Sequence, residues 1–278
     1  KHHPAEPLYT AADADGALGL LRTADYGEAV DLGAGHELTF HPAGHLLGAA
    51  SARICFGEGG QRRRLLVSGD IGRYDDDFMA DPAPPSGPVD YLLVESTYGN
   101  RNHPNDDLDE QLARIVHATM ERGGIVLVPA FAVGRTQEVL FRLARLEHAG
   151  RIPVLDVYVD SPMAVDATEI YRRFARDLNF DWSKTPTRLA TSRTRFVKKT
   201  EDSKKLHEVS GRAIIISASG MATGGRILHH LRRRLPDARN TVLFAGYQVD
   251  GTRGRKLVDG APSIKRFGEE VEVRARVE

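Results

Sequence analysis

The sequence predicts an α/β protein with a mostly parallel β-sheet and helices on both of its faces. Short apolar runs rich in Val, Ile and Leu have the length of buried strands. Longer stretches between them carry apolar residues at helical spacing, such as Val139, Leu140 and Leu143. Because the two patterns alternate along the chain, parallel strands joined by helices are favoured. The expected strands are 65–68, 91–94, 125–128, 154–159, 213–216 and 241–244, and the expected helices are about 106–122, 134–149, 163–177 and 224–234.

Changes in pattern along the chain predict two structural units. The first part is richer in Gly and His, and residues 37–56 have the pattern of a β-hairpin. A loop rich in Pro and Gly, residues 81–88, separates two of the expected strands. We therefore expect one unit over residues 1–100, a compact α/β insertion over 101–249, and a return toward the first unit over 250–278.

The composition excludes several classes of protein. The 278 residues are 41% hydrophobic and 27% charged, which is typical of a globular protein and not of a disordered one. Cys55 is the only cysteine, which excludes a disulfide framework and a Cys-rich zinc module. No apolar run approaches the ~18 residues of a membrane span and no signal peptide opens the chain, so we expect a cytoplasmic protein. The chain starts without Met and ends on a strand-like run, 270–274, so we expect it to be an internal part of a longer protein.

The formal net charge of zero hides an uneven distribution of charge along the sequence. Residues 1–171 hold 14 Lys and Arg against 26 Asp and Glu, a net charge of −12. Residues 172–239 hold 17 against 6, a net charge of +11, and residues 240–278 carry a net charge of +1. The basic surplus favours a polyanionic partner such as nucleic acid. A solvated arginine-rich surface is the alternative, because 30 arginines outnumber 8 lysines.

Three residues near strand ends have side chains suited to a metal site. His45 lies among glycines in HPAGHLLG, where the backbone can turn tightly. Asp70 follows an apolar strand in LLVSGDIG, and Glu95 follows another in YLLVESTYG. Zn²⁺ binds imidazole nitrogen and carboxylate oxygen, so the three residues together suit a zinc site. Taken one at a time, each is more often a turn or capping residue.

Together and in this order, these segments resemble the β-CASP branch of the metallo-β-lactamase fold. That group includes ribonuclease J and the endonuclease subunit of the mRNA 3′-end cleavage complex. The resemblance implies part of a metallo-β-lactamase αββα sandwich with an inserted β-CASP domain. The matching segments are HPAGHLLGAA (41–50), LLVSGDIGR (65–73), YLLVESTYGNR (91–101), GGIVLVPAFAVGRTQEVL (123–140), DSPMA (160–164), ISASGMATGGRILHHL (216–231) and VLFAGYQVDGTRG (242–254).

The resemblance implies a role for each of the three residues. His45 matches the histidine of the family's third metal motif and would bind one zinc ion. Asp70 matches the aspartate of the fourth motif and would bridge two zinc ions, which together hold a hydroxide that attacks phosphorus. Glu95 matches the acidic residue of the first β-CASP motif, which hydrogen-bonds a later catalytic histidine in the family.

The sequence also departs from the family pattern. The HxHxDH motif, which supplies most of the zinc ligands in the family, does not occur in it. Two further histidines of the family would lie beyond Glu278. The chain would therefore supply two zinc ligands, too few for a stable site. We expect this chain alone to be inactive and the intact protein to be catalytic.

Three strand-to-helix turns are candidates for binding phosphate. Segment 217–226, SASGMATGGR, opens a helix, where the helix dipole and the backbone N–H groups favour an anion. Turns 129–136 and 160–163 have the same form, and loops at the C-terminal ends of parallel strands share one crevice. We expect the turns to bind single-stranded RNA, with Phe131 or Tyr247 as a stacking platform; an ordinary helix N-cap is the alternative. The candidate RNA-binding residues are Arg135, Thr136, Ser161, Ser219, Gly220, Thr223, Gly224, Gly225 and Arg226.

The leading functional hypothesis is a zinc-dependent ribonuclease that holds RNA in a cleft between the two units and hydrolyses its phosphodiester bonds. Two alternatives stay open: a catalytically silent β-CASP scaffold subunit of an RNA-processing complex, and a small-molecule metallo-hydrolase. The intact His45, Asp70 and Glu95 favour an enzyme, and the basic segment argues against the second alternative. The expected partner is single-stranded RNA and not a membrane, with a homodimer left open. His229 and His230 are expected on the surface of a helix.

Overall fold

The computed structural model describes residues 7–57, 59–100, 102, 107–179, 189–266 and 268–278. The chain divides into two compact units, each of which is described by itself. Unit 1 comprises Lys1–Ala43, Gly48–Ile71 and Pro82–Glu95, and unit 2 comprises Gly44–Leu47, Gly72–Asp81 and Ser96–Glu278. No helix among the described residues has the length and apolar character needed to cross a membrane.

Unit 1 is built around a five-stranded sheet in which strands that follow one another along the chain are neighbours. Its elements are α1 (Ala11–Leu18), β1 (Ala29–Gly33), β2 (His36–Pro42), β3 (Ala50–Phe56), the 3₁₀ turn Gly59–Gln61, β4 (Arg63–Val67) and β5 (Tyr91–Leu93). The pairs from β1 to β4 are antiparallel, whereas β4 and β5 are parallel. The expected hairpin over 37–56 is confirmed, because Glu37 pairs with Cys55 and Pro42 with Ala50 across β2 and β3.

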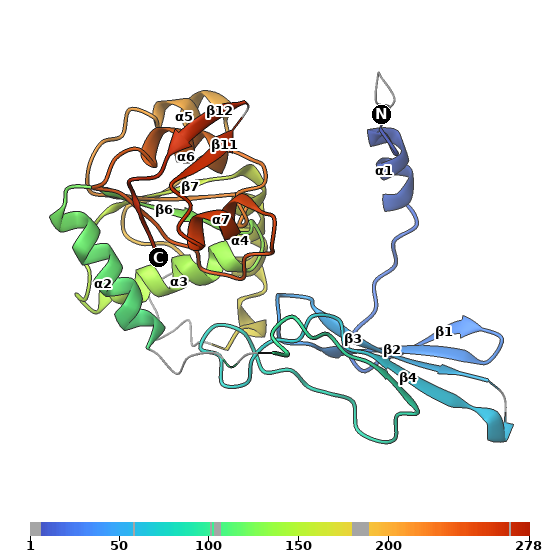
Figure 1. Ribbon diagram of the computed structural model, residues 1–278. Coiled ribbons are helices and arrows are strands. Elements are labelled where there is room, and N and C mark those ends of the chain that lie inside the picture. The colour runs from blue at the N-terminus through green and yellow to red at the C-terminus, as the bar shows by residue number, and fades with distance from the viewer. Residues whose placement is uncertain (1–6, 58, 101, 103–106, 180–188, 267) are drawn as a thin grey trace. The chain divides into compact units, whose positions relative to one another are not determined.

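Unit 2 contains a six-stranded sheet in which every pair of neighbouring strands is parallel (Figure 1). Its strands are β6 (Ile125–Pro129), β7 (Asp156–Asp160), β8 (Thr194–Phe196), β9 (Ala213–Ser217), β10 (Thr241–Val242) and β13 (Arg276–Val277). They lie in the order β13-β10-β6-β9-β7-β8. A separate antiparallel hairpin is formed by β11 (Ser263–Arg266) and β12 (Glu269–Glu272). The expected parallel sheet with connecting helices is therefore confirmed.

Helices of unit 2 cover both faces of this sheet. They are α2 (Leu108–Glu121), α3 (Arg135–His148), α4 (Pro162–Arg173), α5 (Thr200–Lys205), α6 (Ile227–Arg234) and α7 (Arg253–Val258), with a 3₁₀ turn at Ala175–Asp177. One apolar cluster joins α2, α3 and α4 to the sheet, and a second cluster joins α6 and α7 to it. The unit therefore has a central sheet between two helical layers.

The strand β9 shows why the central strands have no polar face. Ile214 and Ile216 belong to the cluster under α2, α3 and α4, whereas Ala213 and Ile215 belong to the cluster under α6 and α7. Successive side chains of a strand point to opposite faces, so a strand covered on both sides needs an unbroken apolar run. All five residues of β9 are buried, as are all five of β6.

Local capping signals set where the helices of unit 2 begin. The Asp107 carboxylate accepts hydrogen bonds from the backbone N–H groups of Asp109 and Glu110 at the start of α2. The expected helix 224–234 begins only at Ile227. Gly225, with a φ of +76°, belongs to the preceding turn, and this backbone conformation is one that glycine adopts without strain.

Residues 250–278 differ from the sequence expectation, because the structure assigns them to unit 2. Strand β13 extends the sheet of this unit by pairing with β10, Thr241 opposite Arg276 and Val242 opposite Val277. Val271 and Ala275 are buried in the cluster under α6 and α7. Apolar burial against unit 2 explains this placement.

The close packing at the start of β6 can be tested with Gly124→Ala. An added Cβ would lie 1.9 Å from the backbone oxygen of Arg239, and backbone atoms cannot move aside easily. We expect the free energy of unfolding to fall by about 1–3 kcal/mol, measured by chemical denaturation followed by circular dichroism. Gly224→Ala is the control, because no atom lies within 4 Å of its added Cβ. Equal effects of the two substitutions would contradict this account of the packing.

Candidate functional site

Three loops lie at one edge of the unit 2 sheet. They follow β6, β9 and β7, which are neighbours in that order, and parallel strands end at the same edge. The loops after β6 and β9 are in contact. Ala130 N donates to Ser217 O at 3.1 Å, and a Cβ added to Gly220 would lie 2.8 Å from the Phe131 ring. The expectation that these turns lie together at the C-terminal ends of the parallel strands is thus confirmed.

The loop after β6 is closed by a hydrogen bond within the loop and carries an exposed cationic side chain. Thr136 is buried, and its hydroxyl donates to Phe131 O at 2.8 Å, so this side chain closes the loop. Arg135 begins α3, and 39% of its side chain is exposed. Phe131 is also exposed, by 45% of the residue's surface. Val133 is exposed as well, so Arg135 is the accessible cation of this loop and Phe131 its accessible aromatic ring.

The loop after β7 is shaped by Ser161, which is buried and forms the N-cap of α4. Its hydroxyl accepts a hydrogen bond from Ala164 N at 3.3 Å. Pro162 follows at the first helical position, where a missing N–H costs nothing. This arrangement is the ordinary helix cap that the sequence left open as an alternative, and contact between Ser161 and RNA stays a prediction.

The glycine-rich loop after β9 folds back on its own hydrogen bonds. The Ser219 hydroxyl accepts from Thr223 N at 3.1 Å and from Gly224 N at 3.2 Å. A Cβ added to Gly225 would lie 2.3 Å from the backbone oxygen of Ala218, so the turn requires glycine there. Ser219 occupies these two N–H groups, and Thr223, whose hydroxyl lies 3.2 Å from Ser219 Oγ, is the exposed polar residue of the loop.

Arg226, at the end of this loop, clamps three chain segments together. Its guanidinium donates to the Asp160 carboxylate at 2.8 Å, to Val197 O at 3.2 Å and to Lys198 O at 2.7 Å. Only 21% of its side chain is exposed. Most of the donors that the sequence assigned to phosphate are therefore used inside the protein, and contact between Arg226 and RNA stays a prediction.

Asp160 is the centre of a buried polar network that the sequence did not reveal. Its side chain is fully buried at the end of β7, and it accepts from Ser203 Oγ and from His230 Nε2, each at 2.7 Å. Burial by itself would raise the pKa of Asp160, but hydrogen bonds from His230, Ser203 and Arg226 outweigh burial and lower it. The expectation that His230 lies on the surface is wrong, because this side chain is fully buried.

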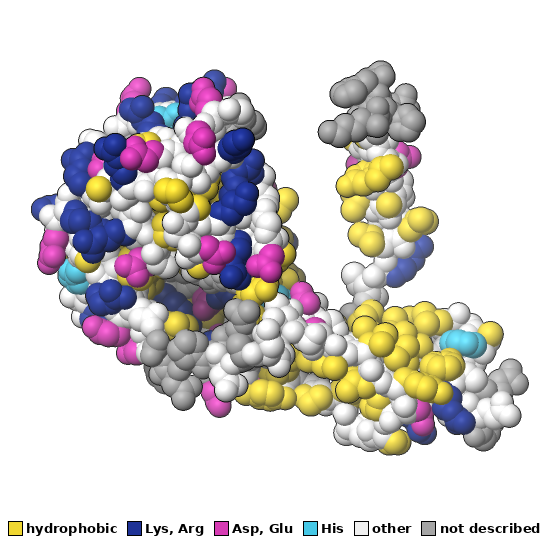
Figure 2. Space-filling view, in the orientation of Figure 1, with side chains coloured by type: hydrophobic (Ala, Val, Ile, Leu, Met, Phe, Trp, Pro, Cys, Tyr) yellow, Lys and Arg dark blue, Asp and Glu magenta, His cyan; other side chains and the backbone are white. Residues whose placement is uncertain are grey.

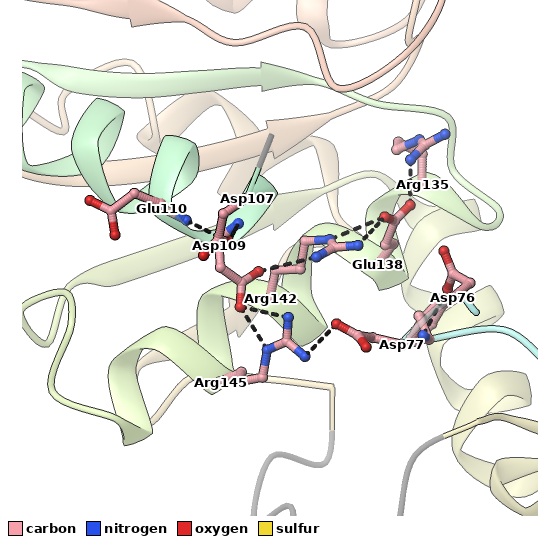
Figure 3. A network of polar contacts seen from close by, with 10 residues as sticks. Asp76, Asp77, Asp107, Asp109, Glu110, Arg135, Glu138, Arg142 and Arg145 are labelled. Atoms are coloured by element: carbon pink, nitrogen blue, oxygen red, sulfur yellow. Dashed lines mark hydrogen bonds and ion pairs between the residues drawn. The ribbon is translucent and has the colours of Figure 1, made fainter. Parts of the chain in front are cut away.

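An ion-pair chain starts at Arg135 and runs along α3 (Figure 3). Arg135 pairs with Glu138, which also accepts from Arg142 Nε at 3.1 Å. Arg142 reaches across to Asp109 of α2 at 3.1 Å. Burial would lower the pKa of Arg142, but Glu138 and Asp109 raise it, so its charge is held firmly. This series of ion pairs fixes the position of the Glu138 carboxylate, and Glu138 in turn orients Arg135.

The same ion-pair chain fastens the segment 72–81 to the helices of unit 2. Arg145 donates to Asp109 at 2.8 Å and to Asp77 at 2.9 Å (Figure 3). Phe78, next to Asp77, is buried beside Phe141 of α3, with ring centroids 5.4 Å apart. The ion pair and the aromatic contact together hold this segment against α3.

The two acidic candidates lie in unit 1, on turns that hydrogen bonds hold together. Ile71 N donates to the Glu95 carboxylate at 2.9 Å, and Glu95 N donates to the Ser68 hydroxyl at 3.0 Å. Asp70 lies between these partners in sequence, and its side chain is exposed. The structure therefore brings the turns that carry Asp70 and Glu95 together within unit 1.

His45 lies in the segment Gly44–Leu47, which belongs to unit 2. Leu47 N in this segment donates to the Tyr171 hydroxyl at 3.2 Å, and Leu46 packs against Gly134 at the start of α3. The His45 side chain is exposed. The pairing of His45 with Asp70 joins residues of different units and stays a prediction.

The donor types of these residues suit zinc, but they do not make a complete site. Imidazole nitrogen and carboxylate oxygen are zinc ligands, and a catalytic zinc ion takes about three protein ligands. Among the described residues, no three His, Cys, Asp or Glu side chains stand close enough together to hold a metal ion. The described part of the chain therefore does not by itself fit a bound zinc ion.

The network around Asp160 can be tested with Asp160→Asn. The substitution leaves the half-buried Arg226 and the buried His230 without an anionic partner, so we expect a loss of about 3–5 kcal/mol in the free energy of unfolding. Asp166→Asn is the control, because its ion pair with Lys198 is exposed and should be worth about 0–1 kcal/mol. Chemical denaturation of each variant measures both values.

The same comparison made at several pH values tests the charge of Asp160. Folding lowers the pKa of Asp160 below the value of about 3.9 that Asp has in an unfolded chain. The ionised Asp160 carboxylate therefore contributes fully to the free energy of unfolding at pH values above about 3.9. The contribution is lost as the pH falls through the lower folded value. The stability difference between wild type and Asp160→Asn should thus be constant from pH 7 to about pH 5 and shrink only in stronger acid. A difference that shrinks near neutral pH would contradict the assignment.

Comparison with known proteins adds to this geometry. Residues 136–257, from α3 to α7, match the family model of the Beta-Casp domain. The chain is 40% identical over 279 residues to a ribonuclease of Thermus thermophilus, covering 98% of this chain and 62% of the relative. It is 35% identical over 253 residues to the transcription termination factor FttA of Methanosarcina mazei, covering 88% and 39%. It is 30% identical over 274 residues to an RNase J-like protein of Methanocaldococcus jannaschii, covering 97% and 62%.

The family model covers β7 to β10 of the parallel sheet, and the matches to the relatives extend over most of both units. The chain spans between 39% and 62% of the length of these relatives. Three of the segments that carried the sequence resemblance form the strand-end loops, namely 123–140, 160–164 and 216–231. Residues 136–257 therefore match the Beta-Casp domain, and the chain as a whole is similar to ribonucleases and RNase J-like proteins of the β-CASP type.

Proposed function

We propose that this protein is a zinc-dependent ribonuclease that hydrolyses phosphodiester bonds of single-stranded RNA. The observation that carries the proposal is the gathering of three strand-end loops at one edge of the unit 2 sheet, with Arg135 and Phe131 exposed there. Relatives named as a ribonuclease and as RNase J-like support RNA as the substrate. The basic surplus of residues 172–239 supports a polyanionic ligand.

Arg135 and Phe131 have complementary parts in holding RNA. A guanidinium has five N–H donors, and the contact with Glu138 leaves others for a phosphate. The Phe131 ring rests on Gly220, where any side chain would collide with it, so its exposed face is held in a fixed position for a base. One residue would bind the backbone charge and the other a base, without regard to sequence.

Zinc is the part of the proposal that concerns the whole protein. When bound, the metal would supply positive charge that stabilises the oxygens of the phosphate under attack. His45 and Asp70 are the ligands that this chain would contribute. Glu95 would act as a positioning residue, since its carboxylate already accepts from Ile71 N beside Asp70.

The metal role is tested in the full-length protein with a chelator and with Asp70→Ala. We expect chelation to abolish hydrolysis of single-stranded RNA and added zinc to restore it. Asp70→Ala should reduce turnover at least 100-fold while RNA affinity changes little, because a metal ligand acts on the chemical step. Asp166→Ala, an exposed carboxylate on α4, is the control and should keep full turnover.

Two outcomes would contradict the proposal. Turnover unchanged in Asp70→Ala would remove the metal role of this residue. RNA binding without any hydrolysis by the wild-type protein would favour the catalytically silent scaffold instead.

The binding role of the strand-end loops is tested with Arg135→Ala. Losing one charged phosphate contact should weaken single-stranded RNA binding about tenfold. It should also lower the slope of log affinity against log salt by about 0.7. Arg114→Ala on α2 removes the same charge from an exposed position and is the control. Fluorescence anisotropy at several salt concentrations measures both, and an unaltered slope in Arg135→Ala would count against this site.

A further inference from the structure

A second feature of unit 2 lies along α6, beside the turn that follows α5. It is a hollow of about 430 Å³ lined by His207, His229, Arg232 and Arg233, which we call the basic hollow. Every lining residue is basic or can become cationic. In Figure 2 a histidine side chain lies among Lys and Arg side chains over α5 and α6. The hollow is therefore suited to an anion.

Hydrogen bonds to the backbone fix the wall of the basic hollow. Arg233 Nε donates to His207 O at 2.9 Å. Its buried neighbour Arg234 donates to Leu206 O at 2.6 Å and to Val209 O at 3.2 Å. These bonds attach α6 to the turn that follows α5. The lining groups consequently need little rearrangement to receive a ligand, which lowers the entropic cost of binding.

The histidine rings are ordered against one another. His207 and His229 have stacked rings with centroids 6.4 Å apart, and the buried His230 meets His207 edge-on at 5.7 Å. The pKa of His207 is lowered, first by burial and then by the nearby positive charges of His230, His229, Arg234 and Arg233. Burial and Arg233 lower the pKa of Arg234 to about 10. The cationic groups thus repel one another, and an anion placed among them would relieve that repulsion.

Acidic groups near the basic hollow only partly offset this charge. Arg232 pairs with Glu269 of β12 at 2.7 Å, but both side chains are more than half exposed, and such a pair contributes little. Arg233 has no ion pair among the described residues. The other charged groups on α5, on the C-terminal turn of α6 and on the turns beside them are Glu201, Asp202, Lys204, Lys205, Glu208, Arg234 and Asp237.

We propose that the basic hollow binds a phosphodiester group of the RNA strand, as a second contact beyond the strand-end loops. This inference rests on the proposed function. Arg233 and Arg232 would donate to the phosphate oxygens, and the rings of His207 and His229 would add charge when protonated. The contact is independent of base identity, since all of the lining groups address the backbone.

The position of the basic hollow favours RNA over a small anion. α6 begins at the glycine-rich loop and rises 1.5 Å per residue, so Arg233 lies about 10 Å along the helix from Arg226. A strand bound at the loops can therefore continue along α6 into the basic hollow. The same unit has another polar hollow, of about 270 Å³, but its lining mixes four aspartates with three arginines and so lacks the uniformly basic character of the basic hollow.

Binding of single-stranded oligonucleotides to the 278-residue chain tests the proposal. We expect Arg233→Gln and Arg232→Gln each to lower the salt slope by about 0.7 for a long oligonucleotide. A short oligonucleotide that fills only the strand-end loops should not respond to these substitutions. Arg176→Gln is the matched control, because this arginine is 87% exposed in the same basic segment and does not line the basic hollow. Thermal unfolding of each variant verifies that it is folded.

Arg232→Gln guards against a structural explanation. This substitution leaves the hydrogen bonds from Arg233 and Arg234 to the turn after α5 in place. A loss of RNA affinity in a variant with unchanged thermal stability therefore reports on ligand contact.

A pH titration gives a readout that a purely structural role would not move. RNA affinity should rise as the pH is lowered from 8 to 6, because binding an anion favours protonated histidine. His229→Gln should reduce this rise, and Arg176→Gln should not. In NMR spectra of the histidine rings, the long oligonucleotide should raise the pKa of His207 and of His229.

The outcomes separate this inference from the proposed function. If the wild-type chain binds RNA and the salt slopes of Arg232→Gln and Arg233→Gln equal the wild-type slope, the basic hollow does not bind RNA. The ribonuclease proposal would still stand. Inorganic phosphate could raise the pKa values of His207 and His229 as much as RNA does, while RNA affinity shows no dependence on oligonucleotide length. That result would assign the basic hollow to free phosphate and contradict its role in RNA binding. No RNA binding by the wild-type chain would overturn both.

Discussion

The parallel register of β6, β9 and β7 is the constraint on which the other features of unit 2 depend. Their pairing is regular, with Ile125 and Asp156 both opposite Ala213 at the start and Pro129 and Asp160 both opposite Ser217 at the end. Because the strands end together, the three following loops lie at one edge, and the helices that return along the sheet end at the other. Both proposed RNA contacts follow from this single arrangement.

The need to satisfy buried polar groups explains why so many motif residues turn inward. Asp160 ends a buried strand, and a carboxylate there is tolerated only because Ser203, Arg226 and His230 all donate to it. In the same way Ser219 satisfies backbone N–H groups of its own loop. The loop sequences that mark the family are thus largely a means of shaping the loops, and a few exposed side chains remain to meet a ligand.

The two ends of α6 differ in chemistry because of what each end faces. Its N-terminal end adjoins the glycine-rich loop, where Arg226 is neutralised by Asp160. Its C-terminal end holds Arg232, Arg233 and Arg234, and cations are favoured there by the helix dipole. The positive charge at the N-terminal end is therefore neutralised inside the protein. The positive charge of Arg232 and Arg233 at the C-terminal end remains at the surface and forms the basic region of unit 2.

The sequence by itself determined the alternation of strands and helices, the hairpin over 37–56, and the edge at which the loops gather. These features depend on periodicity and turn signals within a few residues of one another. Only the tertiary structure decided that His230 is buried against Asp160, that Arg226 is a clamp, and that residues 250–278 complete the sheet of unit 2. Asp160 and His230 are 70 positions apart, and no local pattern records which distant side chain will neutralise a buried charge.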